Sequence, residues 1–125
     1  MDENIVLDQR LLLTKWKIHF RRIIEEFGRR GAKDDDIIPL LHRLRRPTFF
    51  TRDIDFRSPT LCHQNYCLVY LDVRAAEAAQ YIRRVLRHPA LKTSAKRMGS
   101  VIVVNESGLR LWRLHADESW LDWER

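Results

Sequence analysis

The sequence predicts an α/β fold with a largely parallel sheet. Helical patterns alternate with short apolar runs along 125 residues, and such alternation is typical of parallel strands covered by helices. A chain of this length supports one domain with its own core, and no stretch rich in glycine, serine or proline divides it. We therefore expect residues 1–125 to form a single domain, with 115–125 as a candidate partner-binding tail.

The first quarter of the chain predicts a strand followed by a helix. NIVLD at 4–8 is too short for a helix and predicts a buried strand that ends at Asp8. From Leu12 onward, apolar residues recur every three or four positions, which predicts a helix ended by Gly28. In the alternative interpretation this helix breaks near Lys17, and IHFRRI forms a strand.

A second helix is expected after the loop GRRGAK. Asp34, Asp35 and Asp36 place acids on its first turn, where the helix dipole favours negative charge. Pro39 fits near the start of such a helix, where its missing N–H has little effect. The predicted inward face consists of Ile37, Leu40, Leu41 and Leu44.

The rest of the chain predicts four strands and one helix. TFFT at 48–51 and YCLVYLDV at 66–73 are buried apolar runs separated by an irregular segment. AAEAAQYIRRVLRH predicts a helix that stops before Pro89. SVIVV at 100–104 and LRLWRL at 109–114 flank the turn-forming residues NESG, which predicts an antiparallel hairpin.

The charge of the chain favours a polyanionic partner. Lys and Arg number 23 against 17 Asp and Glu, giving a formal net charge of +6 and a pI of about 9.8. The basic stretches RRGAK, RLRRP and RRVLRH are either a nucleic-acid surface or solvated helix faces. The start of the chain lacks a signal-peptide pattern, and no apolar run approaches the roughly 20 residues of a membrane span. We therefore expect a cytoplasmic location and no membrane partner.

Two groups of side chains leave alternatives open. Cys62, His63 and Cys67 have the residue types of a zinc site, but structural zinc takes four ligands, and a buried free cysteine is the favoured interpretation of Cys67. In the tail, Trp120 and Trp123 either form a partner surface or fold back onto the core.

Aspartates fall at the ends of predicted strands. Asp8, Asp53, Asp55 and Asp72 all lie at or just after a carboxyl end, where ligands of parallel sheets bind. Grouped carboxylates hold Mg²⁺ or Mn²⁺ in sites that cleave phosphodiesters. The alternatives are local, since Asp8 suits a helix N-cap and Asp53, Asp55 and Asp72 suit turns or caps.

Three motifs resemble the PIN-domain superfamily, specifically its short stand-alone PIN-like branch with a T-R-D-x-D-F signature. They are VLD at 6–8, GRRGAKDDDII at 28–38 and TRDIDF at 51–56. The resemblance runs from Ile5 to about Leu114. It implies a three-layer α/β/α fold with a mostly parallel sheet, here closed by a C-terminal β-hairpin, and a ribonuclease dependent on Mg²⁺ or Mn²⁺.

The same resemblance implies roles for individual residues. Carried over by position, it makes Asp8, Asp34, Asp53 and Asp55 the catalytic and metal-binding acids and Arg52 a contact to phosphate. Asp34 is preferred to its two acidic neighbours because it directly follows the G-A-x element. The interval from Asp8 to Asp34 is short for this family, so either the first helix is truncated or the second strand is lost.

The resemblance also implies partners. Many active members are toxins of toxin–antitoxin pairs, so RNA and an antitoxin protein are the expected partners. A non-catalytic binding module with the same fold is the alternative function. A homodimer formed through the tail or the hairpin edge is compatible with either.

Overall fold

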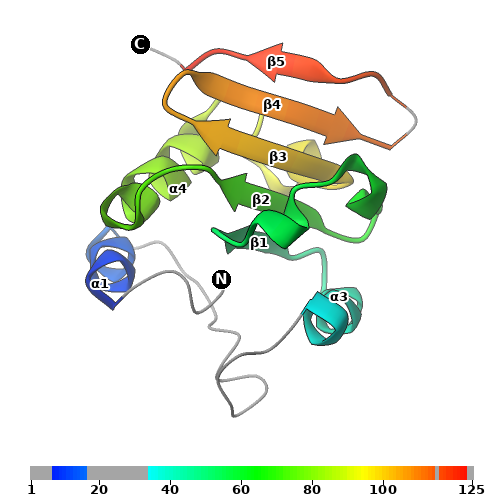
Figure 1. Ribbon diagram of the computed structural model, residues 1–125, viewed down its shortest axis with the longest axis horizontal. Coiled ribbons are helices and arrows are strands. Elements are labelled where there is room, and N and C mark those ends of the chain that lie inside the picture. The colour runs from blue at the N-terminus through cyan, green and yellow to red at the C-terminus, as the bar shows by residue number, and fades with distance from the viewer. Residues whose placement is uncertain (1–6, 17–33, 115, 124–125) are drawn as a thin grey trace.

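The computed structural model describes residues 7–16, 34–114 and 116–123. They form a mixed α/β structure around a five-stranded sheet of order β1-β2-β3-β4-β5 (Figure 1). The strands are β1 (Thr48–Thr51), β2 (Cys67–Leu71), β3 (Ser100–Asn105), β4 (Gly108–Arg113) and β5 (Ser119–Leu121). The first three run parallel, and β4 and β5 add two antiparallel pairings. The predicted α/β class is confirmed. The sheet is only partly parallel, because β4 and β5 pair antiparallel. The sequence predicts β4 as part of the hairpin but does not predict β5.

The apolar strands are buried on both faces of the sheet. Phe50, Val69 and Ile102 are neighbours across β1, β2 and β3 and belong to one core cluster. The residues that precede them on each strand belong to a second cluster. Since successive side chains of a strand point to opposite faces, a strand covered on both faces is a continuous apolar run. This is why these segments are recognisable in the sequence.

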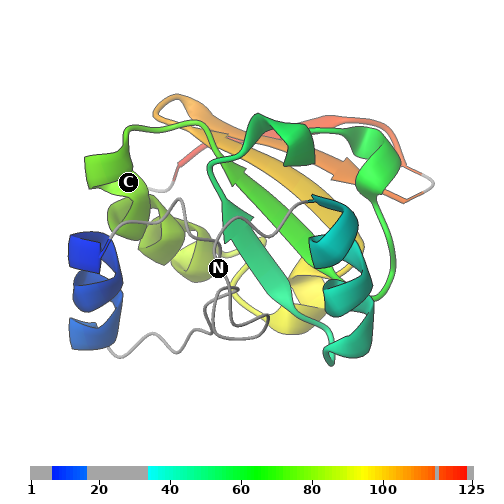
Figure 2. The ribbon, with the colours of Figure 1, turned by 60° about the horizontal axis from the view of Figure 1, so that its bottom comes forward.

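Helices cover both faces (Figure 2). α1 (Leu7–Lys15) and α4 (Ala78–Arg87) lie side by side against the first cluster, and α3 (Asp34–Arg43) packs on the second. Leu13 of α1 and Leu41 of α3 are fully buried. Among the described helices, none is both long enough and apolar enough to cross a bilayer.

The prediction of a strand ending at Asp8 is wrong. α1 begins at Leu7, so Asp8 lies in the first turn of a helix, where the helix dipole favours an acid. Residues 4–6 lie outside the described residues. α1 ends at Lys15 with a turn at Trp16, close to the alternative break near Lys17. The predicted strand IHFRRI and the glycine loop lie outside the described residues.

α3 begins at Asp34 as expected, but Pro39 lies inside it rather than near its start. The sixth residue of a helix normally donates to the carbonyl four positions earlier, so Pro39 removes one helical hydrogen bond. Burial confirms the inward orientation of Leu41, and Leu44 is partly buried beside it. The side chains of Ile37 and Leu40 lie outside the described residues.

The segment between β1 and β2 contains two 3₁₀ turns, η1 (Ile54–Phe56) and η2 (Pro59–Leu61). Phe56 is 1% exposed, and its ring centroid lies 5.3 Å from that of Phe49 on β1. This contact fixes η1 directly beyond the end of β1. After β2, a third 3₁₀ turn, η3 (Ala75–Glu77), leads into α4. α4 ends before Pro89, as predicted.

The tail folds back onto the hairpin. The turn between β3 and β4 consists of Glu106 and Ser107, tighter than the four-residue loop expected. β5 pairs with β4, and the Trp123 indole N–H donates to the Asn105 carbonyl at 2.8 Å. Trp123 and Leu121 are partly buried, whereas Trp120 remains 56% exposed. Folding back onto the core is thus confirmed for Trp123 and Leu121, whereas Trp120 lies on the surface.

Gly108→Ala should destabilise the protein by detaching β5. A Cβ at Gly108 would lie 2.7 Å from the carbonyl oxygen of Leu121, and backbone cannot move aside as a flexible side chain can. We expect a decrease of about 1–3 kcal/mol in the free energy of unfolding, as for other overpacked sites, with a change in tryptophan fluorescence. Gly99→Ala is the control, because a Cβ there meets no atom within 4 Å and only its φ of +83° is unfavourable. A change in tryptophan fluorescence in Gly108→Ala that is no larger than in Gly99→Ala would contradict this packing of β5.

Cys67 should resist thiol reagents in the native protein. Burial raises the pKa of its thiol from 9.0 to about 12, and Arg97 and Arg113 oppose this only partly. At pH 8 we expect a disulfide reagent to label half-buried Cys62 and to label Cys67 only in denaturant. Because the folded pKa exceeds the unfolded one, the contribution of Cys67 to stability is complete below pH 9 and is lost as the pH rises towards 12. Rapid native labelling of both thiols, with Cys67→Ala identifying the second, would contradict this.

Candidate functional site

The carboxyl ends of the three parallel strands meet at one edge of the sheet. Arg52 follows β1, Asp72 follows β2, and Glu106 follows β3. A hollow of about 630 Å³ opens at this edge. Its charged lining residues are Arg52, Asp72, Arg74, Glu77 and Glu106. Residues far apart in the sequence thus form one polar surface, as expected for ligand binding to a parallel sheet.

Asp53 and Asp55 lie at the start of η1. The Asp55 backbone N–H donates to Asp53 Oδ1 at 3.0 Å, and the Asp53 N–H donates to Thr51 Oγ1 at 2.9 Å. Asp53 is half-buried and Asp55 is exposed. The turn role considered for Asp53 is therefore realised. It leaves a ligand role open, because an ionised carboxylate accepts at about four lone-pair sites.

Arg52 joins the ends of β1 and β2. Its Nε donates to the Val73 carbonyl at 3.1 Å, and the side chain is half-buried. This bond fixes the guanidinium group beside the hollow without using its two terminal nitrogens. Arg52 can therefore present a planar pair of donors to a phosphate.

Tyr70 lies within the electrostatic reach of charged groups that follow two neighbouring strands. Burial, the largest effect, raises the pKa of its phenol, and Asp72 raises it further. Arg57 and Arg52 lower it, and Asp53 raises it again. Asp53 and Asp72, which follow neighbouring strands, thus influence the same buried phenol. Asp72 is a site residue that the predicted acid set omitted, although its position at a strand end carries the same signal as that of Asp53.

Glu77 is already paired. Its carboxylate accepts from the Arg74 Nε at 3.2 Å and from the Arg74 backbone N–H at 3.2 Å. These bonds lower the pKa of the Glu77 carboxyl, chiefly through the Arg74 side chain. The pair shapes one wall of the hollow, and Glu77 is a poor candidate for a further ligand role.

Asp8 and Asp34 lie in the first turns of α1 and α3, which pack on opposite faces of the sheet. Next to exposed Asp8, the buried Gln9 accepts through Oε1 from the Ala79 N–H at 2.9 Å, so the start of α1 lies against the start of α4. α3 is joined to β1 by residues 44–47 alone and runs back along it (Figure 2). Asp34, its first residue, therefore starts towards the carboxyl end of β1, but its side chain lies outside the described residues.

The described acids have the right chemistry for a divalent ion, but too few of them lie together to hold one. Asp53 and Asp72 offer the hard oxygen donors that Mg²⁺ and Mn²⁺ prefer. Within the described residues, no three Asp, Glu, His or Cys side chains come close enough together to hold a metal.

The absence of a group of three possible ligands among the described residues also applies to the zinc alternative for Cys62, His63 and Cys67. Cys67 is a fully buried free thiol within β2, which confirms its favoured interpretation. The Cys62 thiol donates to the Trp112 carbonyl at 3.3 Å, and His63 Nδ1 accepts from the Asn65 N–H at 3.1 Å. Both groups are thus engaged in local hydrogen bonds.

Comparison with protein-family models gave no match, and neither did searches of curated proteins and of solved structures. The PIN-like resemblance therefore stays a prediction.

Proposed function

We propose that this protein is a PIN-like ribonuclease dependent on Mg²⁺ or Mn²⁺, with its site at the carboxyl edge of the sheet. One observation carries the proposal: Asp53 and Asp72 follow adjacent parallel strands and act on the same phenol, beside an arginine fixed by a backbone bond. Acids for a metal and a cation for phosphate are what phosphodiester hydrolysis requires. Helices on both faces of the sheet agree with the three-layer PIN-like arrangement.

Each residue has a distinct role in this proposal. Asp53 and Asp72, with Asp34 from the start of α3, would hold the ion, and Asp8 and Asp55 would contribute through bound water. When bound, the ion supplies an activated water and stabilises charge on the leaving oxygen. The Asp55 N–H keeps the Asp53 carboxylate in one orientation. Arg52 binds a non-bridging phosphate oxygen through its terminal nitrogens while Val73 anchors its Nε.

The alternative function is a non-catalytic binding module. It is favoured by the absence of a three-residue metal group within the described residues and by the use of Asp53 Oδ1 in a turn. A toxin role would add an antitoxin-like protein as a partner. Homodimerisation through β5, where Trp120 is exposed, is compatible with either function.

Asp53→Asn should abolish RNA cleavage and preserve the fold. Asparagine keeps an oxygen that accepts the Asp55 N–H but removes the charge that a metal needs. Asp117→Asn is the matched control, because Asp117 is exposed in the loop before β5, at the opposite edge of the sheet. Cleavage of labelled RNA with Mn²⁺ is the measurement. Activity in Asp53→Asn within about tenfold of wild type, or roughly 1.4 kcal/mol in barrier, would exclude Asp53 as a ligand.

Mn²⁺ should stabilise the native protein. At about 100 times its dissociation constant, a metal that binds only the folded state adds roughly 2.7 kcal/mol to the free energy of unfolding. For a chain of this size that is a rise of several degrees in melting temperature. Thermal unfolding with Mn²⁺ or with chelator should show this rise in wild type and in Asp117→Asn, and a smaller one in Asp53→Asn. A wild type indifferent to Mn²⁺, with Asp53→Asn less stable, would leave Asp53 as a turn residue.

A further inference from the structure

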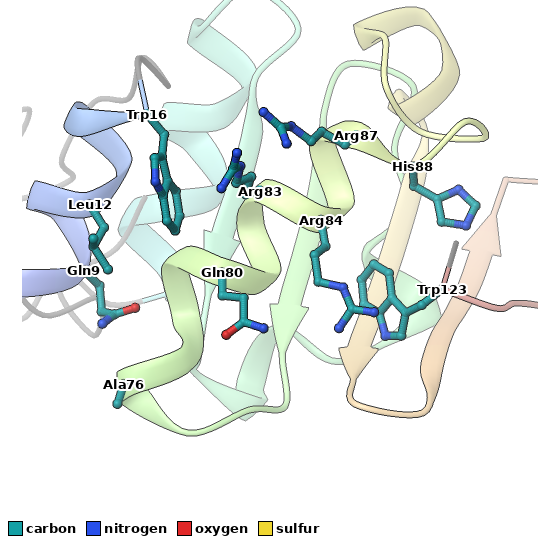
Figure 3. Close-up of a pocket in the computed structure, with 10 residues that line it drawn as sticks. All are labelled: Gln9, Leu12, Trp16, Ala76, Gln80, Arg83, Arg84, Arg87, His88 and Trp123. Atoms are coloured by element: carbon teal, nitrogen blue, oxygen red, sulfur yellow. The ribbon is translucent and has the colours of Figure 1, made fainter. Parts of the chain in front are cut away.

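A second hollow of about 570 Å³ lies along α4, outside the proposed catalytic edge (Figure 3). Trp16, which directly follows α1, forms one wall, and Trp123 of the tail lies on the other side of α4. Between them α4 contributes Arg83, Arg84 and Arg87. We refer to this hollow, with these five residues, as the α4 groove.

The α4 groove is cationic. Three arginines line it and no aspartate or glutamate does. Within the part of the chain that the structure describes, none of the three guanidinium groups is paired with a carboxylate. Arg83 and Arg87 are one helical turn apart, a spacing at which like charges repel. An anion bound between them would relieve that repulsion.

Arg83 also has an unused donor. Its Nε is buried and has no hydrogen-bond partner among the described residues. Buried donors are nearly always satisfied, because an unpaired one loses its hydration without compensation. Because this atom has almost no exposed surface, a ligand oxygen in the groove could accept from it only after a shift of the Arg83 side chain.

Aromatic rings hold two of the arginines in place. The Arg83 Cζ lies 4.6 Å from the centroid of the Trp16 ring, and the Arg84 Cζ lies 4.2 Å from that of Trp123. Arg84 also lies 5.2 Å from the Tyr81 ring centroid. Stacking fixes the guanidinium plane and leaves the N–H groups at its edge free to bind oxygens. The groove is therefore preorganised for an anion with several oxygens, such as a phosphate.

His88, which also lines the hollow, is not available for such a ligand. Its Nδ1 accepts from the Ala90 N–H at 3.1 Å, so Nε2 carries the hydrogen and donates to the Asp122 carbonyl at 2.9 Å. The histidine instead fixes the tail next to Trp123. Binding of an anion in the groove thus depends on the arginines.

One end of the α4 groove reaches the proposed catalytic edge. Gln9, the neighbour of Asp8, and Ala76 of η3 line that end. Tyr81, whose ring lies against Arg84, also lines the hollow at the carboxyl edge. A chain of phosphates that passes the edge can therefore continue along α4.

We infer that the α4 groove binds the phosphates of single-stranded RNA whose scissile bond lies at the carboxyl edge. The choice of RNA rests on the proposed function, whereas the cationic character of the groove does not. A single strand is favoured over a duplex because exposed bases can stack on the indole and guanidinium planes of the groove.

The test is RNA binding in the presence of chelator, so that cleavage plays no part. A short fluorescein-labelled single-stranded RNA is titrated with the full chain by fluorescence anisotropy over a series of salt concentrations. In Arg83→Gln/Arg84→Gln, we expect binding about tenfold weaker or more. The slope of log K against log salt should fall by about 1.4, or about 0.7 for each phosphate that the variant no longer neutralises. Arg45→Gln/Arg46→Gln is the matched control, because it also removes two charges and both residues are exposed in the loop before β1, away from the groove.

Arg87→Glu guards against a folding artefact. Arg87 is exposed and stacks on no ring among the described residues, so reversing its charge should weaken RNA binding without lowering the melting temperature. Wild-type affinity and salt slope in both groove variants would overturn the inference. So would an equal weakening of RNA binding in Arg45→Gln/Arg46→Gln, because the effect would then follow net charge alone.

Two further arms identify the ligand and separate this inference from the proposed function. If adenosine monophosphate displaced the labelled RNA as well as unlabelled RNA does at the same molar concentration, the groove would be a nucleotide site and the RNA assignment would be overturned. Duplex RNA bound as tightly as the single strand would overturn the single-strand preference. Groove-dependent binding without cleavage in Mn²⁺ would support the groove and reject the nuclease. Cleavage that is indifferent to the groove variants would do the reverse.

Discussion

The parallel pairing of β1, β2 and β3 is the constraint on which the rest of the structure depends. Parallel strands place their carboxyl ends at one edge, and backbone bonds continue the pairing there, because the Asp72 N–H donates to the Val104 carbonyl at 2.8 Å. At the opposite edge, the Cys67 N–H donates to Pro47 and the Gly99 N–H donates to Tyr66, both at 2.9 Å. The same pairing requires crossovers, in which η1 and η2 lie between β1 and β2, and α4 lies between β2 and β3. The carboxyl edge and the α4 groove are thus both consequences of one sheet.

α4 connects the core to both proposed sites. Its inner face buries Ala78, Ile82 and Val85, and the helical period then directs Arg83 and Arg87 outward. Its beginning is fixed at the carboxyl edge, since Gln9 accepts the Ala79 N–H there. Packing energy that stabilises the core therefore also fixes the direction of the arginines.

Elements defined by local patterns are predictable from the sequence, and those defined by tertiary pairing are not. β1 to β4 and α4 are apolar runs or amphipathic stripes bounded by breakers, and the structure confirms them. The run at 4–8 predicts a strand, but Leu7 and Asp8 begin a helix because an acid suits its first turn. β5 escapes prediction because SWL is too short to show a period, and only pairing with β4 makes it a strand. The α4 groove joins α1, α4 and the tail, so no local pattern could show it.

The turn at Asp53 and the proposed ligand role of Asp53 need not compete. A carboxylate held by the Asp55 N–H has lost its rotational freedom before any ligand arrives, and such preorganisation lowers the entropic cost of binding. Charges of both signs face the same phenol, because Asp72 and Asp53 raise the pKa of Tyr70 while Arg57 and Arg52 lower it. The described part of the edge therefore carries charges of both signs rather than acids alone. Under the proposed function, a divalent cation would require at least one carboxylate beyond Asp53 and Asp72, because the described residues contain no group of three possible ligands.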